Sequence, residues 1–555
     1  MVAPVIHDLW TLLAPPEDNP RIPIANEKLR ALLVRRGIED GESYRQFVAP
    51  AITDLHDPSS IHGMDHACER IARAVRDGEG IVIYGDYDVD GVTSIVLLQS
   101  VLRSLGADAG FVVPHRLVDG YGLKMEVLDR VLSERNVKLV ITVDCGITSV
   151  EPVRRAIERG IDVIITDHHL PPGTLPEAAA VLNPKQPGCT YPFKELAGVG
   201  VAFKLCCELL RRSGKKVSVE SLLKIAAIGT VADVAPLIGE NRTITWLGLA
   251  GLADVRNPGL RALLKRLGLE GRALRAVDVG FKIGPRINAA GRLASANTAI
   301  DLFAAADEDA AWQICSELDR MNAERQQIEL QVRESAEAQI RGGERVLILA
   351  GEGWHRGVLG LTAGRIAQRY HRPTLVMTIE GEQCVGSGRS ISTIDLHGAL
   401  QSVSDLFTHF GGHEFACGFS LESRNLDQLK TRLHGRFAGL DEEHFRREAR
   451  IDSTITLGEL DAEFIAAHEM LQPFGAGNAQ PLFLLNGVTV TATRTFAEDC
   501  TELALRDATG TGTAVLWPSV KSLAPLTGDL DLLVKVEPDR YKGSRLEIVD
   551  ARSRA

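Results

Sequence analysis

Three aspartates alternate along one short stretch, Asp86-Tyr87-Asp88-Val89-Asp90-Gly91, directly after the apolar run 81–84. In an extended chain, residues two apart point to the same side. The three carboxylates would then converge on one spot, where they repel each other unless a cation neutralises them. A solvated acidic loop and a calcium loop are the alternatives, but a calcium loop needs flanking helices and a later Glu. The spacing therefore favours a metal site.

Further candidate ligands lie downstream. Asp144 and the triplet Asp167-His168-His169 each follow an apolar run, and Asp233 precedes a proline break. Taken singly, Asp144 fits a helix N-cap, Asp233 fits a turn or cap, and a lone histidine is usually structural. Together, many carboxylates with one or two imidazoles suit Mn²⁺ or Mg²⁺. Such a set fits two cations about 3.5–4 Å apart with a bridging carboxylate, the arrangement used for phosphoryl hydrolysis.

The apolar runs themselves predict the elements that position these residues. They are short, β-branched and apolar throughout, which is typical of buried parallel strands in βαβ units. Open α/β sheets place their ligands at the carboxyl ends of such strands. We therefore predict an α/β domain with a parallel sheet over residues 76–300. Its expected strands are 81–84, 111–113, 139–143 and 163–166.

The rest of the chain divides by composition. Residues 1–75 look helical and mixed, with no assigned role, and residues 301–340 contain neither Gly nor Pro, which predicts a long connector helix. A second α/β segment is expected over 341–445. From 450 to 555, short alternating stretches between Gly-containing turns predict a small antiparallel barrel.

Composition bounds the protein class. The 555 residues carry 62 basic and 73 acidic side chains, for a net charge of −11, which argues against coating nucleic acid by bulk charge but does not exclude a nuclease. The nine cysteines are scattered without a CxxC pair. We expect no disulfides, no structural zinc, no membrane span and no secretory signal. A cytoplasmic location follows as an expectation.

The acidic stretches resemble the four signature motifs of the DHH phosphoesterase family. Other stretches resemble the branch of that family formed by bacterial single-strand-specific DNA exonucleases. The match runs in order from about residue 76 to the C-terminus and includes 114–122, 284–292, 354–360, 386–390, 411–413 and 473–478. Two departures are visible. Cys417 stands where the family more often has Ala, and Glu414 adds negative charge near His413, which puts only local packing and pocket charge in doubt.

The resemblance implies roles for individual residues. Asp144 would bridge two cations, His169 would face the scissile phosphate, and Asp167 would orient a histidine from behind. The implied metal ligands are Asp86, Asp88, Asp90, Asp144, His168 and Asp233. By the same resemblance, the fold is two α/β lobes, a DHH domain and a DHH-associated domain, joined by the long helix and followed by an OB-fold barrel.

Cationic groups are needed where charge develops on the phosphate. Arg389 and His413 in the second lobe are the candidates, and Arg389 lies in a Gly-Ser-Gly stretch that otherwise reads as a turn. By resemblance, Arg116, Ser387 and Arg389 would hold a 5′-terminal phosphate and so set 5′→3′ polarity. Arg116 is otherwise a surface residue.

Several residues are candidates for contacts with the strand. Arg286, Asn288 and Arg292 lie beside small residues and form a plausible phosphate and base contact set, the alternative being an ion pair with an acidic helix. Tyr121 could stack on a base or pack internally. On the barrel, basic residues that include Lys542 and Arg545 surround an aromatic residue, which is typical of a single-strand groove or of a solvated face.

The sequence therefore predicts a two-metal 5′→3′ exonuclease on single-stranded DNA that releases 5′-mononucleotides in recombination and repair, with Mn²⁺ or Mg²⁺ as cofactors. A DHH hydrolase of short oligonucleotides or small phosphates is the alternative, and a scaffold without activity is disfavoured because the whole ligand set is present. We expect a monomer, with single-stranded DNA as substrate and with single-strand-binding protein and a DNA helicase as partners.

Overall fold

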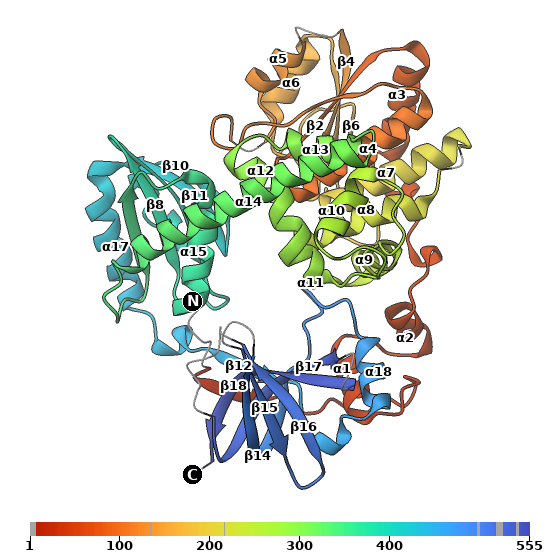
Figure 1. The fold of residues 1–555 in the computed structure, drawn as a ribbon. Helices are drawn as coiled ribbons and strands as arrows, with labels where there is room; N and C mark the ends of the chain where they lie inside the picture. Colours follow the sequence, from red (N-terminus) through yellow and green to blue (C-terminus); the bar gives the residue numbers. More distant parts are fainter. Residues whose placement is uncertain are drawn as a thin grey trace. The chain divides into compact units, whose positions relative to one another are not determined.

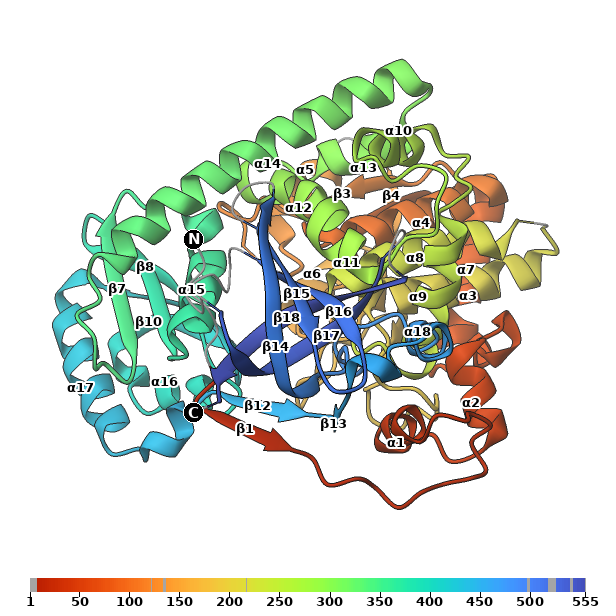
Figure 2. The ribbon, with the colours of Figure 1, turned by 60° about the horizontal axis from the view of Figure 1, so that its bottom comes forward.

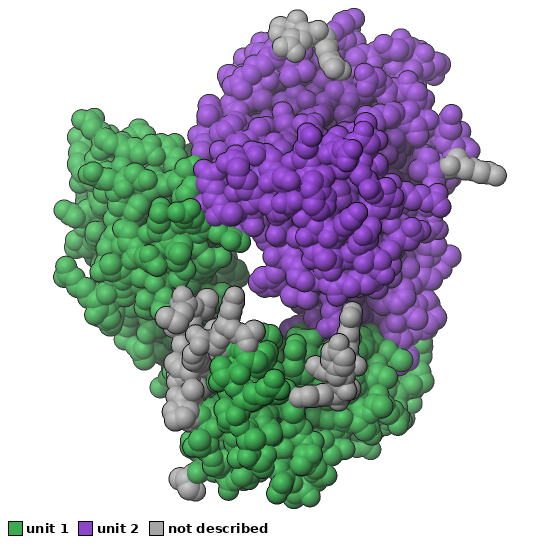
Figure 3. Space-filling model, in the orientation of Figure 1, with its two compact units in different colours: residues 1–41, 326–470, 480–555 green, residues 42–325, 471–479 purple. Residues whose placement is uncertain are grey.

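The computed structural model describes residues 7–120, 122–132, 136–215, 217–496, 500–517, 526–539 and 543–554. The chain forms two compact units (Figure 3). Unit 2 comprises Glu42–Arg325 and Leu471–Ala479. Unit 1 is assembled from three separate stretches, Met1–Gly41, Gln326–Met470 and Gln480–Ala555.

Unit 2 is built on a five-stranded parallel sheet of order β3-β2-β4-β5-β6. Its strands are β2 (Gly80–Gly85), β3 (Gly110–Val112), β4 (Val137–Val143), β5 (Asp162–Thr166) and β6 (Ala180–Leu182). All neighbouring pairs run parallel. The four predicted strands are confirmed, and β6 is an additional edge strand of three residues.

Helices bury both faces of this sheet, which explains why its strands are apolar throughout. Ile81 and Ile83 face a core shared with α3 (Met64–Asp77), α4 (Val89–Leu105) and α7 (Gly198–Ser213). Val82 and Tyr84 face the opposite core, with α5 (Met125–Leu132) and α6 (Val150–Glu158). The site-bearing loops therefore leave a rigid, fully covered sheet.

A helical region completes unit 2. It contains α2 (Gly41–Val48), α8 (Val219–Ala232), α9 (Gly239–Gly251), α10 (Pro258–Arg266), α11 (Ala276–Asp278), the π-helical turn Val279–Ile283, α12 (Gly284–Leu293) and α13 (Asn297–Ala304). The 30-residue helix α14 (Glu308–Glu337) follows (Figure 1). The boundary between the units falls within this helix, after Arg325. The predicted long helix that joins two α/β lobes is thus confirmed.

Unit 1 contains a mixed five-stranded sheet of order β10-β11-β9-β8-β7. Only β7 and β8 run parallel, connected by the helix α15. The bounds are β7 (Leu347–Glu352), α15 (Arg356–Tyr370), β8 (Thr374–Glu380), β9 (Gln383–Arg389), β10 (Phe407–His413) and β11 (Ala416–Glu422). α15 and the end of α14 cover one face, while α16 (Leu396–Gln401) and α17 (Leu426–Ala438) cover the other.

The remainder of unit 1 includes a closed five-stranded barrel, because β14 pairs with both β15 and β17. Its strands are β14 (Phe483–Phe496), β15 (Cys500–Arg506), β16 (Thr511–Leu516), β17 (Asp529–Asp539) and β18 (Gly543–Ser553). The expectation of a purely antiparallel barrel was wrong, since β16 and β18 pair in parallel. Alternating side chains reveal a strand but not its direction.

The N-terminal segment attaches to this C-terminal part of unit 1. The strand β1 (Leu9–Leu12) pairs in parallel with β12 (Glu448–Ile451), as Figure 2 shows. The indole of Trp10 donates to Asp550 Oδ2 at 3.0 Å. The same region contains α1 (Glu27–Arg35), β13 (Ser453–Thr454) and α18 (Ala462–Glu469).

The sequence analysis expected neither disulfides nor a membrane-spanning helix. All nine cysteines are free thiols. Within the described residues, none of the helices is both long enough and apolar enough to span a bilayer.

Candidate metal centre

The carboxyl ends of three neighbouring strands bring the candidate ligands together. Gly85 at the end of β2 is level with Val143 of β4, and Val143 is level with Thr166 of β5. The residues that follow these positions, Asp86, Asp144 and Asp167, therefore leave the sheet side by side, as the strand pattern predicted.

The aspartates after β2 do not all sit in extended chain. Asp88 is the N-cap of α4 and accepts hydrogen bonds from the amides of Asp90 and Gly91 at 3.0 and 3.1 Å. Asp90 lies in the first turn of that helix and accepts from the amides of Gly198 and Val199, at 2.8 and 2.7 Å. Alternation along an extended chain thus accounts for Asp86 and Asp88 but not for Asp90, which the first turn of α4 brings inward.

All six predicted ligands belong to groups whose ligand atoms lie within 4.8 Å of one another. The three groups are Asp86–Asp88–Asp144, Asp144–His168–His169 and Asp90–His168–Asp233. Asp144 belongs to two of them, which is the position a bridging carboxylate requires. His168 Nε2 lies 3.2 Å from Asp144 Oδ1, and His168 Nδ1 lies 3.9 Å from Asp233 Oδ2. The ligand roles remain predictions that this geometry supports.

The backbone around Asp144 is unusual. Asp144 has φ of +59°, a left-handed conformation that L-residues seldom adopt. Gly198 at the start of α7 faces it so closely that a Cβ atom there would lie 2.5 Å from Asp144 Oδ1. Sequence reasoning missed Gly198, and the only signal was the pair of glycines within residues 197–200. The carboxylate is therefore held between a strained backbone and a helix N-terminus.

The electrostatics indicate that the cluster needs cations. Burial, followed by the neighbouring carboxylates, raises the pKa of Asp90 to about 7 and that of Asp233 to about 9, and raises those of Asp86 and Asp144 well above the ordinary value. Burial lowers the pKa of His168 to about 3.

Two buried atoms support the same reading. Asp86 Oδ1 and His168 Nε2 have no hydrogen-bond partner among the described residues. Buried polar atoms rarely lack a hydrogen-bond partner. Buried carboxylate oxygens together with an uncharged imidazole fit divalent cations, which would offset the repulsion among the carboxylates.

Asp167 supports the histidines from behind. It accepts from the amide of Ile147 at 2.9 Å, and its Oδ1 lies 2.7 Å from His169 Nδ1. Although burial opposes the change, this hydrogen bond and the nearby carboxylates raise the pKa of His169. Asn183, a fully buried residue that sequence reasoning also missed, donates to the carbonyl of His169 at 2.9 Å.

Two of the predicted strand-contact arginines lie beside Tyr87, next to the ligands. The guanidinium of Arg116 lies 4.9 Å from the centre of the Tyr87 ring, and its charge opposes the rise in the pKa of Asp86. Arg292 acts on the pKa of Tyr87 in the same sense. Positive charge therefore borders the acidic cluster.

Of the other residues predicted to contact the DNA strand, two already contact other parts of the protein and two lie outside the described residues. Asn288 Oδ1 accepts from the amide of Val89 at 3.2 Å, which ties α12 to the metal-binding loop. Arg286 Nε lies 2.5 Å from Asp319 Oδ1 on α14, so the ion pair with an acidic helix is present. Tyr121 and Lys542 lie outside the described residues.

The candidate anion-binding residues of the second lobe share one face of the sheet in unit 1. Arg389, Ala416 and His413 are level with one another across β9, β11 and β10. Ser387 lies two residues before Arg389 and so on the same face. α15 covers this face, and a Cβ atom at Gly360 would come within 2.9 Å of Arg389 and 3.6 Å of Ser387 Oγ. Their role toward phosphate remains a prediction.

The two departures from the family pattern, Cys417 and Glu414, are not part of the row formed by Ser387, Arg389 and His413. Cys417 is 3% exposed and packs in the core on the opposite face of the sheet. Glu414 is exposed at the hairpin tip.

The barrel face around Arg545 is balanced in charge. Arg545 is level with Glu537 across β17 and β18, and Lys535 is level with Glu547. The guanidinium of Arg545 also lies 5.6 Å from the centre of the Trp517 ring. A strand-binding role for this face therefore remains a prediction.

Comparisons with known proteins agree with this geometry. Family models match as the DHH family, N-terminal domain at residues 80–230, the DHHA1 domain at 343–439 and the RecJ OB domain at 451–549. A protein from Salmonella typhimurium named single-stranded-DNA-specific exonuclease RecJ is 37% identical over 82% of each chain. The chain belongs to the RecJ family. The Escherichia coli and Bacillus subtilis RecJ proteins are 35% and 37% identical.

The chain can also be compared with its relatives in length and with solved structures in fold. The chain spans 64% of the Bacillus subtilis RecJ protein and 82% of the Escherichia coli one. Crystal structures of Thermus thermophilus RecJ with Mn²⁺ and with Mg²⁺ match 99% of this chain and 80% and 79% of their own, with TM-scores of 0.85 and 0.79 at 30% and 28% identity. The predicted family and fold are confirmed, and the grouped ligands of this chain are consistent with the divalent cations that the two Thermus thermophilus structures hold.

Proposed function

We propose that this protein is a two-metal exonuclease that degrades single-stranded DNA from the 5′ end and releases 5′-mononucleotides. The observation that carries the proposal is that Asp86, Asp88, Asp90, Asp144, His168 and Asp233 all fall into overlapping groups of three, within each of which the ligand atoms lie within 4.8 Å of one another. The substrate follows from the names of the RecJ relatives.

The residues divide the work of hydrolysis. Two divalent cations held by the six ligands would supply hydroxide at neutral pH and neutralise charge on the phosphate. Asp167 Oδ1 engages His169 through Nδ1, and we assign to His169 Nε2 the donation of a hydrogen bond to a phosphate oxygen. Its raised pKa keeps that proton in place. Arg116 adds positive charge beside the ligands.

The 5′→3′ direction of degradation depends on how the protein binds the 5′ end of the DNA strand. We assign the 5′-phosphate to Ser387 and Arg389, which lie on one sheet face against Gly360 of α15. His413, level with Arg389, would stabilise negative charge on the bound phosphate. The setting that we propose is recombination and repair in the cytoplasm, by a monomer that works with single-strand-binding protein and a helicase.

The test is degradation of end-labelled strands with Mn²⁺, Mg²⁺ or a chelator, with each end blocked in turn. We expect cation-dependent release of mononucleotides, blocked by modification of the 5′ end only. A dinucleotide and a duplex serve as comparison substrates. Faster turnover of the dinucleotide than of the long strand would favour a hydrolase of short oligonucleotides, and equal turnover with a blocked 5′ end would refute the polarity.

A further inference from the structure

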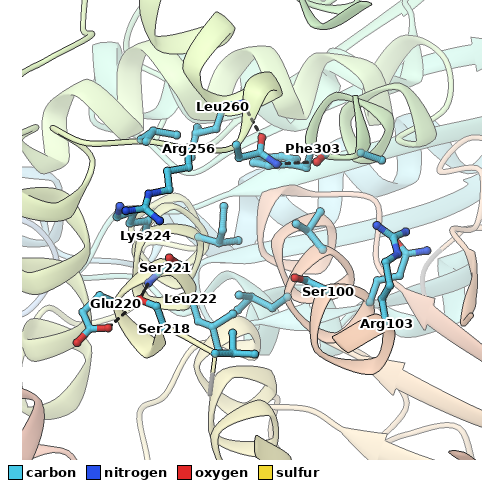
Figure 4. A pocket seen from close by; sticks show the side chains of 18 of the residues that line it. Ser100, Arg103, Ser218, Glu220, Ser221, Leu222, Lys224, Arg256, Leu260 and Phe303 are labelled. Atoms are coloured by element: carbon cyan, nitrogen blue, oxygen red, sulfur yellow. Dashed lines mark hydrogen bonds between the residues drawn. The ribbon is translucent and has the colours of Figure 1, made fainter. Parts of the chain in front are cut away.

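Unit 2 contains a cavity of about 570 Å³ that the proposed reaction does not use. It lies among α4, α8, α10 and α13 and the loop 254–257 (Figure 4). Its volume falls within the roughly 300–1,000 Å³ typical of small-molecule sites.

The cavity is separate from the metal centre. On α4 its lining begins at Val96, and on α8 it ends at Ile225, whereas the ligands Asp90 and Asp233 lie at the other ends of these helices. At a rise of about 1.5 Å per residue, the separation along each helix is roughly 9–12 Å. None of the six predicted metal ligands lines the cavity.

The floor of the cavity is apolar. Leu222 and Ile225 of α8, Leu260 of α10 and Ile300 and Phe303 of α13 contribute to it, and each is at most 9% exposed. A flat or aliphatic group placed on them would bury apolar surface without displacing a hydrogen bond.

Cations stand on two sides of this floor. Figure 4 shows Arg256 beside Lys224 on one side and Arg103 on the other. Neither Arg103 nor Arg256 has an ion pair or hydrogen bond with any residue that the structure describes. An unpaired guanidinium at the edge of a cavity is available to phosphate or to acceptors on a base.

The other polar groups of the rim are less available. Ser218 and Asn257 cap the N-termini of α8 and α10, accepting from the amides of Ser221 at 3.3 Å and Leu260 at 2.8 Å. Glu220 accepts from the hydroxyl of Ser218 at 2.8 Å. Lys224 Nζ donates to the carbonyl of Asp254. The charge most available to a ligand is therefore that of Arg103 and Arg256, with Lys224 adding positive charge beside Arg256.

We propose that this cavity binds a nucleoside phosphate. The base would lie on the apolar floor, the phosphate would contact Arg256 and Lys224, and Arg103 would donate to acceptors on the base or sugar. A fatty acid would leave one of the separated cations unmatched, and an inorganic anion would leave the floor empty. The inference goes beyond the exonuclease activity and does not depend on it.

The test is calorimetric titration of the full chain with dAMP and ADP, in chelator so that no cation mediates binding. We expect one site per chain, with inorganic phosphate and deoxyadenosine each bound at least about tenfold more weakly. Arg103→Gln and Arg256→Gln should each weaken dAMP binding about tenfold. Ser100→Trp, at an exposed position of the rim, should abolish it.

Two further variants locate the binding. Arg76→Gln removes an exposed charge outside the cavity and should leave the affinity unchanged. Asp144→Asn alters the metal centre and should also leave it unchanged. Absence of nucleotide binding, binding unaffected by the Arg103 and Arg256 variants, or loss of binding in Asp144→Asn would each overturn the proposal, while the cation-dependent nuclease assay would still stand or fall by itself.

Discussion

Gly198→Ala is the sharpest test of how the metal centre is held. The new methyl group would lie 2.5 Å from Asp144 Oδ1, 2.8 Å from its Cγ and 2.9 Å from its Cβ. Either Asp144 or the start of α7 must then move. If α7 moves, the two amide hydrogen bonds to Asp90 lengthen as well, so both carboxylates are displaced.

The expected magnitudes follow from these contacts. Overpacking a buried site costs about 1–3 kcal/mol of unfolding free energy. Disturbing the support of metal ligands typically costs about 10–100-fold in metal affinity or activity. We therefore expect Gly198→Ala to fold, to bind Mn²⁺ about 10–100-fold more weakly in calorimetric titration, and to cut a labelled single strand correspondingly slowly at a fixed, sub-saturating Mn²⁺ concentration.

Gly200→Ala is the matched control, two residues further along the same helix. There the nearest atoms to the methyl group belong to the side chain of Leu196, at 3.2 Å and beyond, and that side chain can shift. We expect a smaller loss of stability and unchanged Mn²⁺ affinity. If Gly198→Ala bound Mn²⁺ and cleaved as well as the unaltered chain, the close apposition of α7 and Asp144 would have no part in metal binding.

Three further outcomes can be checked. With pKa values of about 7 and about 9, Asp90 is partly protonated and Asp233 largely protonated at neutral pH without metal, so Mn²⁺ binding should release protons and tighten as pH rises. Titration in buffers of different ionisation enthalpy measures the release, and its absence would contradict the raised pKa values. Arg389→Gln should lower kcat/KM on a 5′-phosphorylated strand about 10–100-fold and have less effect on a 5′-hydroxyl strand; an equal loss on both would argue against end recognition. Hydrogen bonds from His7, Trp10 and Ala551 hold the pKa of Asp550 below its usual value although burial opposes this. Asp550→Asn should therefore lower the unfolding free energy of unit 1 by about 1–3 kcal/mol at pH 7. Urea unfolding should show this difference narrowing as pH falls below about 4, where the carboxylate becomes protonated.

The sequence was informative where burial and chemistry coincide. Strands covered on both faces must be apolar throughout, so β2, β4 and β5 stood out, and the polar residues at their ends then had to meet at one edge. The ligand set followed from this local rule and from the resemblance to the DHH phosphoesterases.

What could not be predicted depends on contacts between distant residues. The approach of Gly198 to Asp144 and the pairing of β1 with β12 leave no local pattern. The three residues of β6 are too few to show a period, and Asp90 was assigned to extended chain because one helical turn cannot be told from a strand end. For Arg286, the sequence offered two partners, and only the structure shows the ion pair with Asp319.

The division of unit 1 into separate stretches has a consequence for protein synthesis. The amide of Arg447 donates to Asp8 at 2.8 Å across 439 residues, and β1 pairs with the strand that follows Arg447. At roughly 5–20 residues per second, a ribosome would need about 20–90 s to deliver that partner. The parallel sheet of unit 2 can form from residues 80–182 during this wait. The nascent chain must meanwhile carry β1 as an unpaired edge, and its length of only four residues limits the risk of aggregation.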